Sequence, residues 1–257
     1  MMVYTEPGLR GLELWRGIAR GATLDQLREQ KEEYFLGLRE FLVRLHAGEA
    51  ESADDGETHA LRQAAGFARA VLCGGEALHP SLEPILQSPS LPFAIEIDRD
   101  GPYAGRRGAL EIFRRMRWQY GVALDVGQTQ LKVMTADEVA TLPRDPELLP
   151  FGARAIDRAT GRERLRTLVR EGLARVERPD GVVLALPVEL DAYGVAYPAT
   201  YPGLFGPVQP IFADLFTCPW VVINDAVLAG LGFPPRRGEK TLVVTLGFGI
   251  GGAVWQG

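Results

Sequence analysis

Residues 121–132 (Gly-Val-Ala-Leu-Asp-Val-Gly-Gln-Thr-Gln-Leu-Lys) constrain the fold of this chain more than any other segment. An apolar run carries one carboxylate, Asp125, turns at Gly127 and then resumes. The pattern predicts a strand, a tight turn and a second strand, with chemistry at the tip of the hairpin. Gly127 lets backbone N–H groups approach an anion, Thr129 adds a hydroxyl, and Lys132 adds charge. Taken alone, the segment favours an ordinary hairpin whose polar residues only shape the turn.

A second glycine-rich segment changes that balance. Residues 241–255 (Thr-Leu-Val-Val-Thr-Leu-Gly-Phe-Gly-Ile-Gly-Gly-Ala-Val-Trp) again predict strand, turn and strand. Between the two hairpins, residues 221–226 (Val-Val-Ile-Asn-Asp-Ala) predict a buried strand that ends in polar residues. The two hairpins resemble the phosphate-binding loops of the actin, hexokinase and Hsp70 superfamily, and within it the chain resembles the ROK family of sugar kinases.

The resemblance extends over residues 121–255, in five segments that keep the family's order. Residues 125–132 are similar to the first phosphate motif, and residues 186–194 resemble the family's Pro-Gly-Pro-Val-Asp loop. Residues 201–206 are similar to the sugar-side loop that follows it, and residues 224–226 match Asn-Asp-Ala. Residues 245–252 look like the second phosphate motif. Each segment is a weak signal alone, and their common order makes the match specific.

The resemblance implies an ATP-dependent kinase that phosphorylates a hydroxyl of a sugar or sugar-like small molecule with Mg²⁺. Asp225 would be the catalytic base, and Asp125 would hold Mg²⁺ directly or through water. The residues implied at the nucleotide are Asp125, Gly127, Thr129, Lys132, Thr245, Gly247, Gly249, Gly251, Gly74 and Gly75. The residues implied at the acceptor are Asn224, Asp225, Thr200 and Gly203. For Asp225 a helix N-cap is the alternative, because Asn-Asp before Ala-Val-Leu-Ala is a good helix start.

The order of the motifs predicts a circular permutation. Gly74-Gly75 follows an apolar run and resembles the family's adenosine motif, yet it precedes the first phosphate motif instead of following the second. Joining Gly257 to Met1 restores the family's order and cuts one domain between its second and third strands. We therefore expect Met2–Tyr4 to lie as a strand beside Ala253–Trp255. Both termini should lie on one surface, and termini on different domains would contradict this interpretation.

The expected fold is α/β, with two ribonuclease-H-like domains of the actin-like ATPase type around a nucleotide cleft. Residues 120–232 would form the domain with the first phosphate motif and the acceptor site. Residues 1–119 together with 233–257 would form the nucleotide-side domain. This division follows from three strands predicted after Tyr120, and from the alternation of helix and strand after them.

Some positions depart from the family. Phe248 stands where the family's loop usually has Thr, and Val188 and Glu189 replace Gly and Pro beside the sugar site. The family's Glu-x-Gly-His segment is not visible in the sequence. These departures keep two alternatives open. One is a non-catalytic nucleotide-binding or regulatory protein, and the other is a small-acid kinase or ATPase of the same superfamily.

Composition excludes several classes. A formal net charge of −5, with 28 Lys and Arg spread along the chain, argues against a nucleic-acid partner. Two cysteines are too few for a disulfide framework, and no apolar run of membrane-spanning length is present. We expect a cytoplasmic protein with no membrane partner and a small-molecule acceptor, for which a sugar is the first candidate. The resemblance also allows a homodimer.

Overall fold

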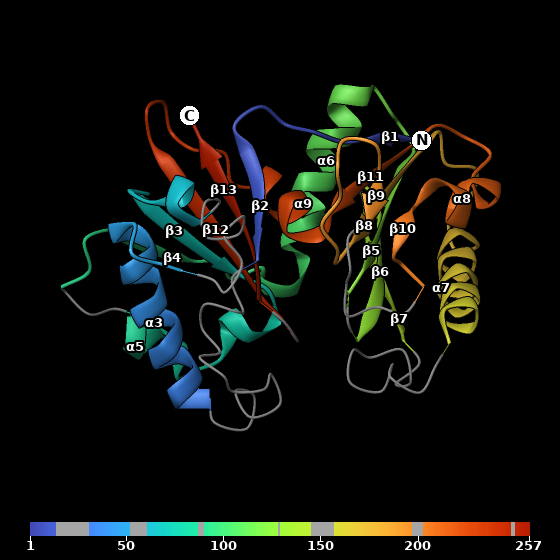
Figure 1. The fold of residues 1–257 in the computed structure, drawn as a ribbon. Coiled ribbons are helices and arrows are strands. Elements are labelled where there is room, and N and C mark those ends of the chain that lie inside the picture. Colours follow the sequence, from blue (N-terminus) through green and yellow to red (C-terminus); the bar gives the residue numbers. More distant parts are fainter. Residues whose placement is uncertain are drawn as a thin grey trace. The chain divides into compact units, whose positions relative to one another are not determined.

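The computed structural model describes residues 1–13, 31–51, 61–86, 90–127, 129–144, 157–196, 203–247 and 250–257. It is a mixed α/β structure, as the sequence predicts, with two larger mixed sheets and one two-stranded sheet among these residues (Figure 1). The contacts divide the chain into two compact units. Unit 1 comprises Met1–Pro7 and Gly105–Gly232, and unit 2 comprises Gly8–Ala104 and Phe233–Gly257.

The main sheet of unit 1 has the strand order β1-β11-β8-β5-β6-β7. Its strands are β1 (Met2–Val3), β5 (Gly121–Val126), β6 (Gln130–Met134), β7 (Val139–Pro143), β8 (Gly181–Leu186) and β11 (Trp220–Asn224). β5, β6 and β7 pair antiparallel, whereas β5, β8, β11 and β1 run parallel. A small antiparallel pair is formed by β9 (Val195–Ala196) and β10 (Gly206–Pro207).

Helices cover both faces of this sheet. They are α6 (Ala104–Met116), α7 (Arg158–Leu173), the short α8 (Gln209–Phe212) and α9 (Asp225–Leu231). α7 packs on one face, where a Cβ added at Gly172 would meet the side chains of Leu131 and Leu124. α6 packs on the other face, where a Cβ added at Gly121 would meet the ring of Phe113. The alternation of side chains along β5 therefore directs Leu124 toward α7, and its neighbour Asp125 toward α6 and α9.

Unit 2 has a five-stranded sheet in the order β2-β13-β12-β3-β4. Its strands are β2 (Leu9–Glu13), β3 (Arg69–Cys73), β4 (Ala94–Ile97), β12 (Lys240–Leu246) and β13 (Ile250–Gln256). Its helices are α3 (Lys31–Ala47), α5 (Leu82–Leu86) and the 3₁₀ turns Gly75–Leu78 and Gly101–Tyr103. α3 lies beside the sheet of unit 2 (Figure 1). Its buried residues Phe35, Leu38 and Leu42 belong to the same apolar cluster as Val244 of β12. In the sequence these apolar residues recur at the 3.6-residue spacing of an amphipathic helix.

The two sheets share one spatial arrangement of strands. In each, three neighbouring strands pair antiparallel, and two further strands lie parallel beside one edge strand of the three. The spatial order is β7-β6-β5-β8-β11 in unit 1 and β2-β13-β12-β3-β4 in unit 2. β5 in unit 1 thus corresponds to β12 in unit 2. In unit 2 the third strand, β2, precedes the other four in the sequence.

The expected placement of Met2–Tyr4 is wrong. Met2 and Val3 pair parallel with Val221 and Val222 of β11, in unit 1, and the neighbour of β13 is Leu9–Glu13. The N-terminal and C-terminal residues therefore belong to different units, contrary to expectation. A strand of two residues has too little pattern to specify a partner, whereas the parallel neighbour β11 presents a buried edge for it to extend.

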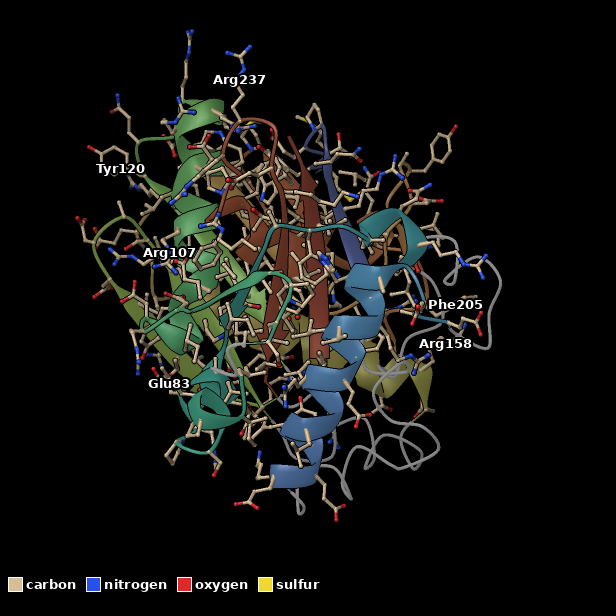
Figure 2. The ribbon with its side chains drawn as sticks, turned by 90° about the vertical axis from the view of Figure 1, so that its left-hand side faces the viewer. Glu83, Arg107, Tyr120, Arg158, Phe205 and Arg237 are labelled. Carbon is tan, nitrogen blue, oxygen red and sulfur yellow. The ribbon has the colours of Figure 1, made fainter. Side chains whose placement is uncertain are left out.

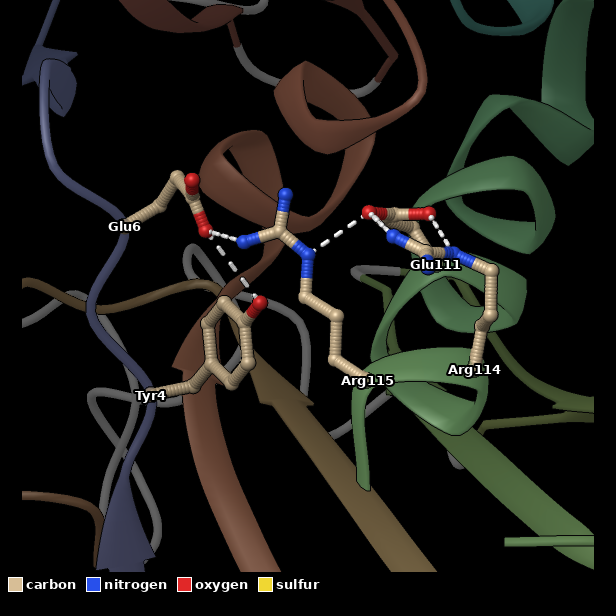
Figure 3. Close-up of polar contacts among 5 residues, drawn as sticks. All are labelled: Tyr4, Glu6, Glu111, Arg114 and Arg115. Atoms are coloured by element: carbon tan, nitrogen blue, oxygen red, sulfur yellow. Dashed lines mark hydrogen bonds and ion pairs between the residues drawn. The ribbon is translucent and has the colours of Figure 1, made fainter. Parts of the chain in front are cut away.

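A polar network anchors residues 1–7 to unit 1 (Figure 3). Arg115 of α6 bridges Glu6 and Glu111, and its Nε lies 2.6 Å from Glu111 Oε1. The Tyr4 hydroxyl donates to Glu6 at 3.3 Å. Hydrogen bonds from Arg114 and then Arg115 lower the pKa of Glu111 to about 2. The network and the packing of α6 on α9 explain why residues 1–7 and 105–119 group with residues 120–232, which differs from the division expected from the sequence.

Candidate functional site

Asp125 is the last residue of β5 on the face of the sheet that α6 covers, and its side chain is buried. Lys132 lies directly opposite it on β6, and the Lys132 Nζ is 2.9 Å from Asp125 Oδ2. Residues that face each other across an antiparallel pair share one face, so the hairpin register itself forms this ion pair. The sequence predicted both residues at the hairpin but assigned Lys132 to the nucleotide rather than to Asp125.

The first turn of α6 also lies against Asp125. A Cβ added at Gly105 would be 3.7 Å from Asp125 Oδ2. The N-terminal end of a helix carries a partial positive charge, which favours a nearby carboxylate. Gly105 was not predicted as a site residue. A glycine at the beginning of a predicted helix is the only signal for it, and that signal is too common to be specific.

Asn224 and Asp225 stand at the junction of β11 and α9. The Asn224 Oδ1 accepts hydrogen bonds from the N–H groups of Ala226 and Val227 at 3.0 and 3.1 Å, so Asn224 is the N-cap of α9. Its Nδ2 donates to the carbonyl of Val188 at 3.0 Å. The capping role considered for Asp225 is therefore filled mainly by Asn224. Asp225 begins the helix and accepts a hydrogen bond from the N–H of Ala226 at 2.8 Å.

The pKa of Asp225 is raised to about 7, mainly by burial and then by the nearby Asp125 carboxylate. The N–H of Ala226 and the Lys132 ammonium act in the opposite direction. Since a carboxylate is affected strongly only by charges close to it, Asp125, Lys132 and Asp225 form one electrostatic cluster. A carboxyl group that titrates near pH 7 can take up or release a proton under physiological conditions.

The cluster lies where ligands commonly bind in open α/β sheets. β5, β8 and β11 run parallel, with Asp125 at the carboxyl end of β5 and Asp225 directly after β11. The carboxyl ends of parallel strands form the usual binding edge of such sheets. Among the residues described, no group of three or more His, Cys, Asp or Glu side chains is arranged to hold a metal ion. Asp125 and Asp225 are the two carboxylates of the cluster.

The turn after β5 is tight. The N–H of Gly127 donates to the carbonyl of Asp125 at 3.0 Å, and a Cβ at Gly127 would be 3.0 Å from the carbonyl oxygen of Gln130. Thr129 is exposed. Arg144, which follows β7 and is 5% exposed, donates from Nη1 to the carbonyl of Gly127 at 2.5 Å. Sequence reasoning missed Arg144, because an arginine after a strand carries no specific pattern.

In unit 2 the predicted nucleotide residues gather at one end of β12. Gly74 has φ +97°, and a Cβ there would be 2.3 Å from the carbonyl oxygen of Leu246. Gly74 therefore lies against Leu246. The next residue, Gly247, is exposed. Thr245 pairs with Gly251 across β12 and β13. Space around the Cα of Gly75 is open, with nothing within 4 Å of an added Cβ.

The remaining acceptor residues are less informative. Gly203, with φ +92°, is buried against the backbone of Arg162 in α7, so the structure gives it a packing role. Nearby, the Arg158 guanidinium lies 4.9 Å from the centre of the Phe205 ring, and both side chains are labelled in Figure 2. Thr200 and Gly249 lie outside the described residues. The same holds for Phe248, which stands where the family usually has Thr.

No protein-family model matches this chain, and a search of curated proteins finds no match. In the part of the chain that the structure describes, no helix has the length and apolar character needed to span a bilayer.

Proposed function

We propose that this protein is an ATP-dependent kinase that phosphorylates a hydroxyl of a sugar or sugar-like small molecule, with Mg²⁺ as cofactor. The observation that carries the proposal is the cluster of Asp125, Lys132 and Asp225. It combines a buried carboxylate, a cation and a carboxyl group with a pKa of about 7 at the carboxyl ends of parallel strands. Phosphoryl transfer uses these elements as a cation site and a proton acceptor.

The shared topology of the two sheets supports a ribonuclease-H-like fold for each unit. Three antiparallel strands followed by two parallel ones would make β5 and β12 the first strands of the two halves. Each of these strands leads into one of the glycine turns. The circular permutation expected from joining Gly257 to Met1 is contradicted, because the two ends of the chain belong to different units. In unit 2 the third antiparallel strand is β2, and the amide N–H of Gln256 donates to the carbonyl of Gly8 just before it at 2.6 Å.

In this mechanism Asp225 accepts the proton of the acceptor hydroxyl. The hydroxyl oxygen then forms a bond to the γ-phosphorus of ATP, while the bond between that phosphorus and the β,γ-bridging oxygen breaks and ADP leaves. A pKa near 7 suits this role, because the group is partly ionised at neutral pH and still basic enough to take the proton. Asn224 caps α9 and thereby fixes the position of Asp225.

Asp125 fits a magnesium ion in its chemistry. Mg²⁺ prefers oxygen ligands and is commonly held by one or two carboxylates together with substrate phosphates and water. The Lys132 ammonium already occupies a cation position 2.9 Å from Asp125 Oδ2. When bound, Mg²⁺ would neutralise charge on the transferring phosphate. In this proposal the turn that begins at Gly127 would supply backbone N–H groups to the phosphates.

The proposal is tested by nucleotide binding and turnover. ATP with Mg²⁺ at about a hundred times its dissociation constant should stabilise the fold by roughly 2.7 kcal/mol. Gly127→Val should abolish this shift, because a side chain would stand where phosphate approaches. ATP consumption should then be measured with a panel of sugars and small acids. An unchanged melting temperature with millimolar Mg·ATP would contradict nucleotide binding.

A nucleotide-binding protein without phosphotransfer is the second candidate. The sequence favours it at two points, because Phe248 replaces the family's Thr and the Glu-x-Gly-His segment is missing. The two candidate functions predict different results with the panel of acceptors. The kinase should transfer phosphate to at least one acceptor, whereas the binding protein should show the thermal shift and no transfer to any of them.

A further inference from the structure

The ammonium group of Lys132 neutralises the Asp125 carboxylate inside unit 1. The two residues face each other across β5 and β6, and the Lys132 Nζ lies 2.9 Å from Asp125 Oδ2. Their side chains are only 17% and 10% exposed, respectively. Charges that are so little exposed are weakly screened by water and salt. The ammonium therefore cancels much of the attraction that Asp125 would otherwise exert on another cation.

This ion pair weakens the binding of a metal ion at Asp125. A magnesium ion on this carboxylate would bring two further positive charges next to the Lys132 ammonium. Like charges that lie close together in a poorly screened site repel each other strongly. The affinity of Asp125 for Mg²⁺ is therefore low for as long as the ammonium stays on its Oδ2.

A phosphate group near the pair changes this balance, because its negative charges attract the ammonium away from Asp125. The lysine side chain is flexible, whereas the backbone of β6 is paired with β5 on one side and with β7 on the other. The ammonium can therefore turn from the carboxylate to a phosphate while the strand stays in place. A phosphate and a divalent cation then favour each other's binding, which is a coupling between two ligands.

We propose that Lys132 is the resident counter-ion of Asp125 and makes the binding of Mg²⁺ depend on a bound phosphate group. The inference rests on the proposed nucleotide-binding function. Without nucleotide, Lys132 holds Asp125 and opposes the metal ion. With nucleotide, the phosphate takes the Lys132 ammonium and leaves Asp125 to the metal ion. The protein thus takes up Mg²⁺ together with its nucleotide and binds little of the free ion.

The first test compares the dissociation constant of Mg²⁺ in the nucleotide-free protein with that in the protein saturated with ADP. ADP carries phosphates but has no γ-phosphate to transfer. Calorimetry measures both constants, with a correction for Mg²⁺ bound by free ADP. In the wild type we expect Mg²⁺ to bind at least about 10-fold more tightly with ADP than without it, as is typical of coupled sites. Equal constants in the wild type would overturn the inference.

Lys132→Met separates the role of Lys132 from direct contact between Mg²⁺ and phosphate. The variant keeps the length of the side chain and removes its charge. We expect Mg²⁺ to bind the nucleotide-free variant about 10-fold more tightly than wild type, the factor expected from losing one charge-assisted hydrogen bond that competes for Asp125. The tightening by ADP should shrink by about the same factor. If both quantities stay at their wild-type values in the folded variant, Lys132 is only a structural ion pair and the inference is wrong.

Two further variants at the same position complete the test. Lys132→Arg keeps the positive charge and holds a carboxylate at least as firmly, so its nucleotide-free form should bind Mg²⁺ no more tightly than wild type. Lys132→Gln also removes the charge, and it is measured in the same way if Lys132→Met does not fold. Tighter binding of Mg²⁺ in Lys132→Arg than in wild type would contradict the counter-ion role.

Arg166→Met is the matched control. The Arg166 side chain is 16% exposed and forms an ion pair with Asp214 at 2.6 Å, also in unit 1. It belongs to α7, which packs on the face of the sheet opposite to α6. The control removes one positive charge, as Lys132→Met does, and should leave both Mg²⁺ constants unchanged. An equal tightening of Mg²⁺ binding would make the effect one of total charge, and would overturn the inference.

The outcomes distinguish this inference from the proposed function. If the wild-type protein binds no ADP, with or without Mg²⁺, the proposed function is refuted, and the coupling is refuted with it. If ADP binds but neither Lys132→Met nor Lys132→Gln changes the Mg²⁺ constants, only the role of Lys132 is refuted.

Discussion

A Cβ added at Gly108 of α6 would stand 1.7 Å from the carbonyl oxygen of Leu228 in α9. The two helices therefore cross in backbone contact, and a glycine is required at the crossing. Because α9 begins at Asp225 and the first turn of α6 lies beside Asp125, this crossing sets the position of both ends of the candidate site.

Gly108→Ala should therefore destabilise the protein, by about 1–3 kcal/mol as is typical of overpacking. The obstacle is a backbone atom, which cannot rotate away as a side chain would. Unfolding in urea, followed by circular dichroism, measures the change. Gly75→Ala is the matched control, because an added Cβ there meets nothing within 4 Å. Equal stability of the two variants would show that α6 and α9 can separate at little cost.

Asp225→Asn should reduce phosphotransfer while preserving the fold. Loss of a general base typically lowers the rate by about 10²–10⁴-fold. Under the proposed function nucleotide affinity should change little, because backbone N–H groups and the metal, rather than Asp225, would hold the phosphates. Turnover on an identified acceptor, measured together with the dissociation constant for Mg·ATP, checks both points. Unchanged turnover would remove Asp225 from the mechanism.

The raised pKa of Asp225 predicts a pH-dependent stability. The folded state keeps the Asp225 proton up to a pKa of about 7, whereas the unfolded chain loses it near the ordinary aspartate pKa of 3.8. Between these values the folded state binds more protons, so the free energy of unfolding falls as pH rises. Asp225→Asn lacks this effect. Relative to wild type it should gain about 1–3 kcal/mol between pH 5 and pH 8.

That comparison is made by urea unfolding in the presence of a chelator, so that no metal contributes. The difference between variant and wild type cancels the other titrating groups, which are common to both proteins. A difference that is the same at pH 5 and pH 8 would mean that Asp225 titrates at an ordinary pKa.

The Arg115–Glu6 contact predicts how firmly residues 1–7 are held on unit 1. Arg115→Met should free Glu6, whose side chain is 11% exposed, and speed hydrogen exchange at the Tyr4 amide, which bonds to the Val222 carbonyl at 2.9 Å. We expect exchange to be about 10-fold faster, from the loss of one charged hydrogen bond. Arg114→Met is the control, because Arg114 pairs with Glu111 but makes no bond to Glu6 in the network of Figure 3. Equal exchange in both variants would assign the anchoring to the β1–β11 pairing.

The local sequence pattern was sufficient to predict the strands and the helix that carry the candidate site. An apolar run that carries Asp125 and turns at Gly127 predicted the β5–β6 hairpin, and Asn224-Asp225 predicted the start of α9. Which of Asn224 and Asp225 forms the N-cap was not predictable, because Asn and Asp cap helices about equally well. Only the structure shows that Asn224 forms the cap.

Contacts between residues that pair across strands could not be predicted from the sequence. Lys132 was assigned to the nucleotide because its pairing with Asp125 depends on the hairpin register, which the turn length sets. Leu9–Glu13 was not predicted as a strand, since its Gly11 and charged residues weaken the pattern. Its pairing with β13 joins residues far apart in the sequence, and no local signal specifies such a partner.

The position of β2 has a consequence for synthesis on the ribosome. Its neighbour in the sheet, β13, begins at Ile250, so β2 emerges long before the strand it pairs with. Unit 1 has all but its first seven residues in the block 105–232, and it can fold before β12 and β13 are made. The core against which α3 packs stays incomplete until β12 is made, because β12 supplies Leu242, Val244 and Leu246 to it, and an incomplete apolar core is prone to aggregation.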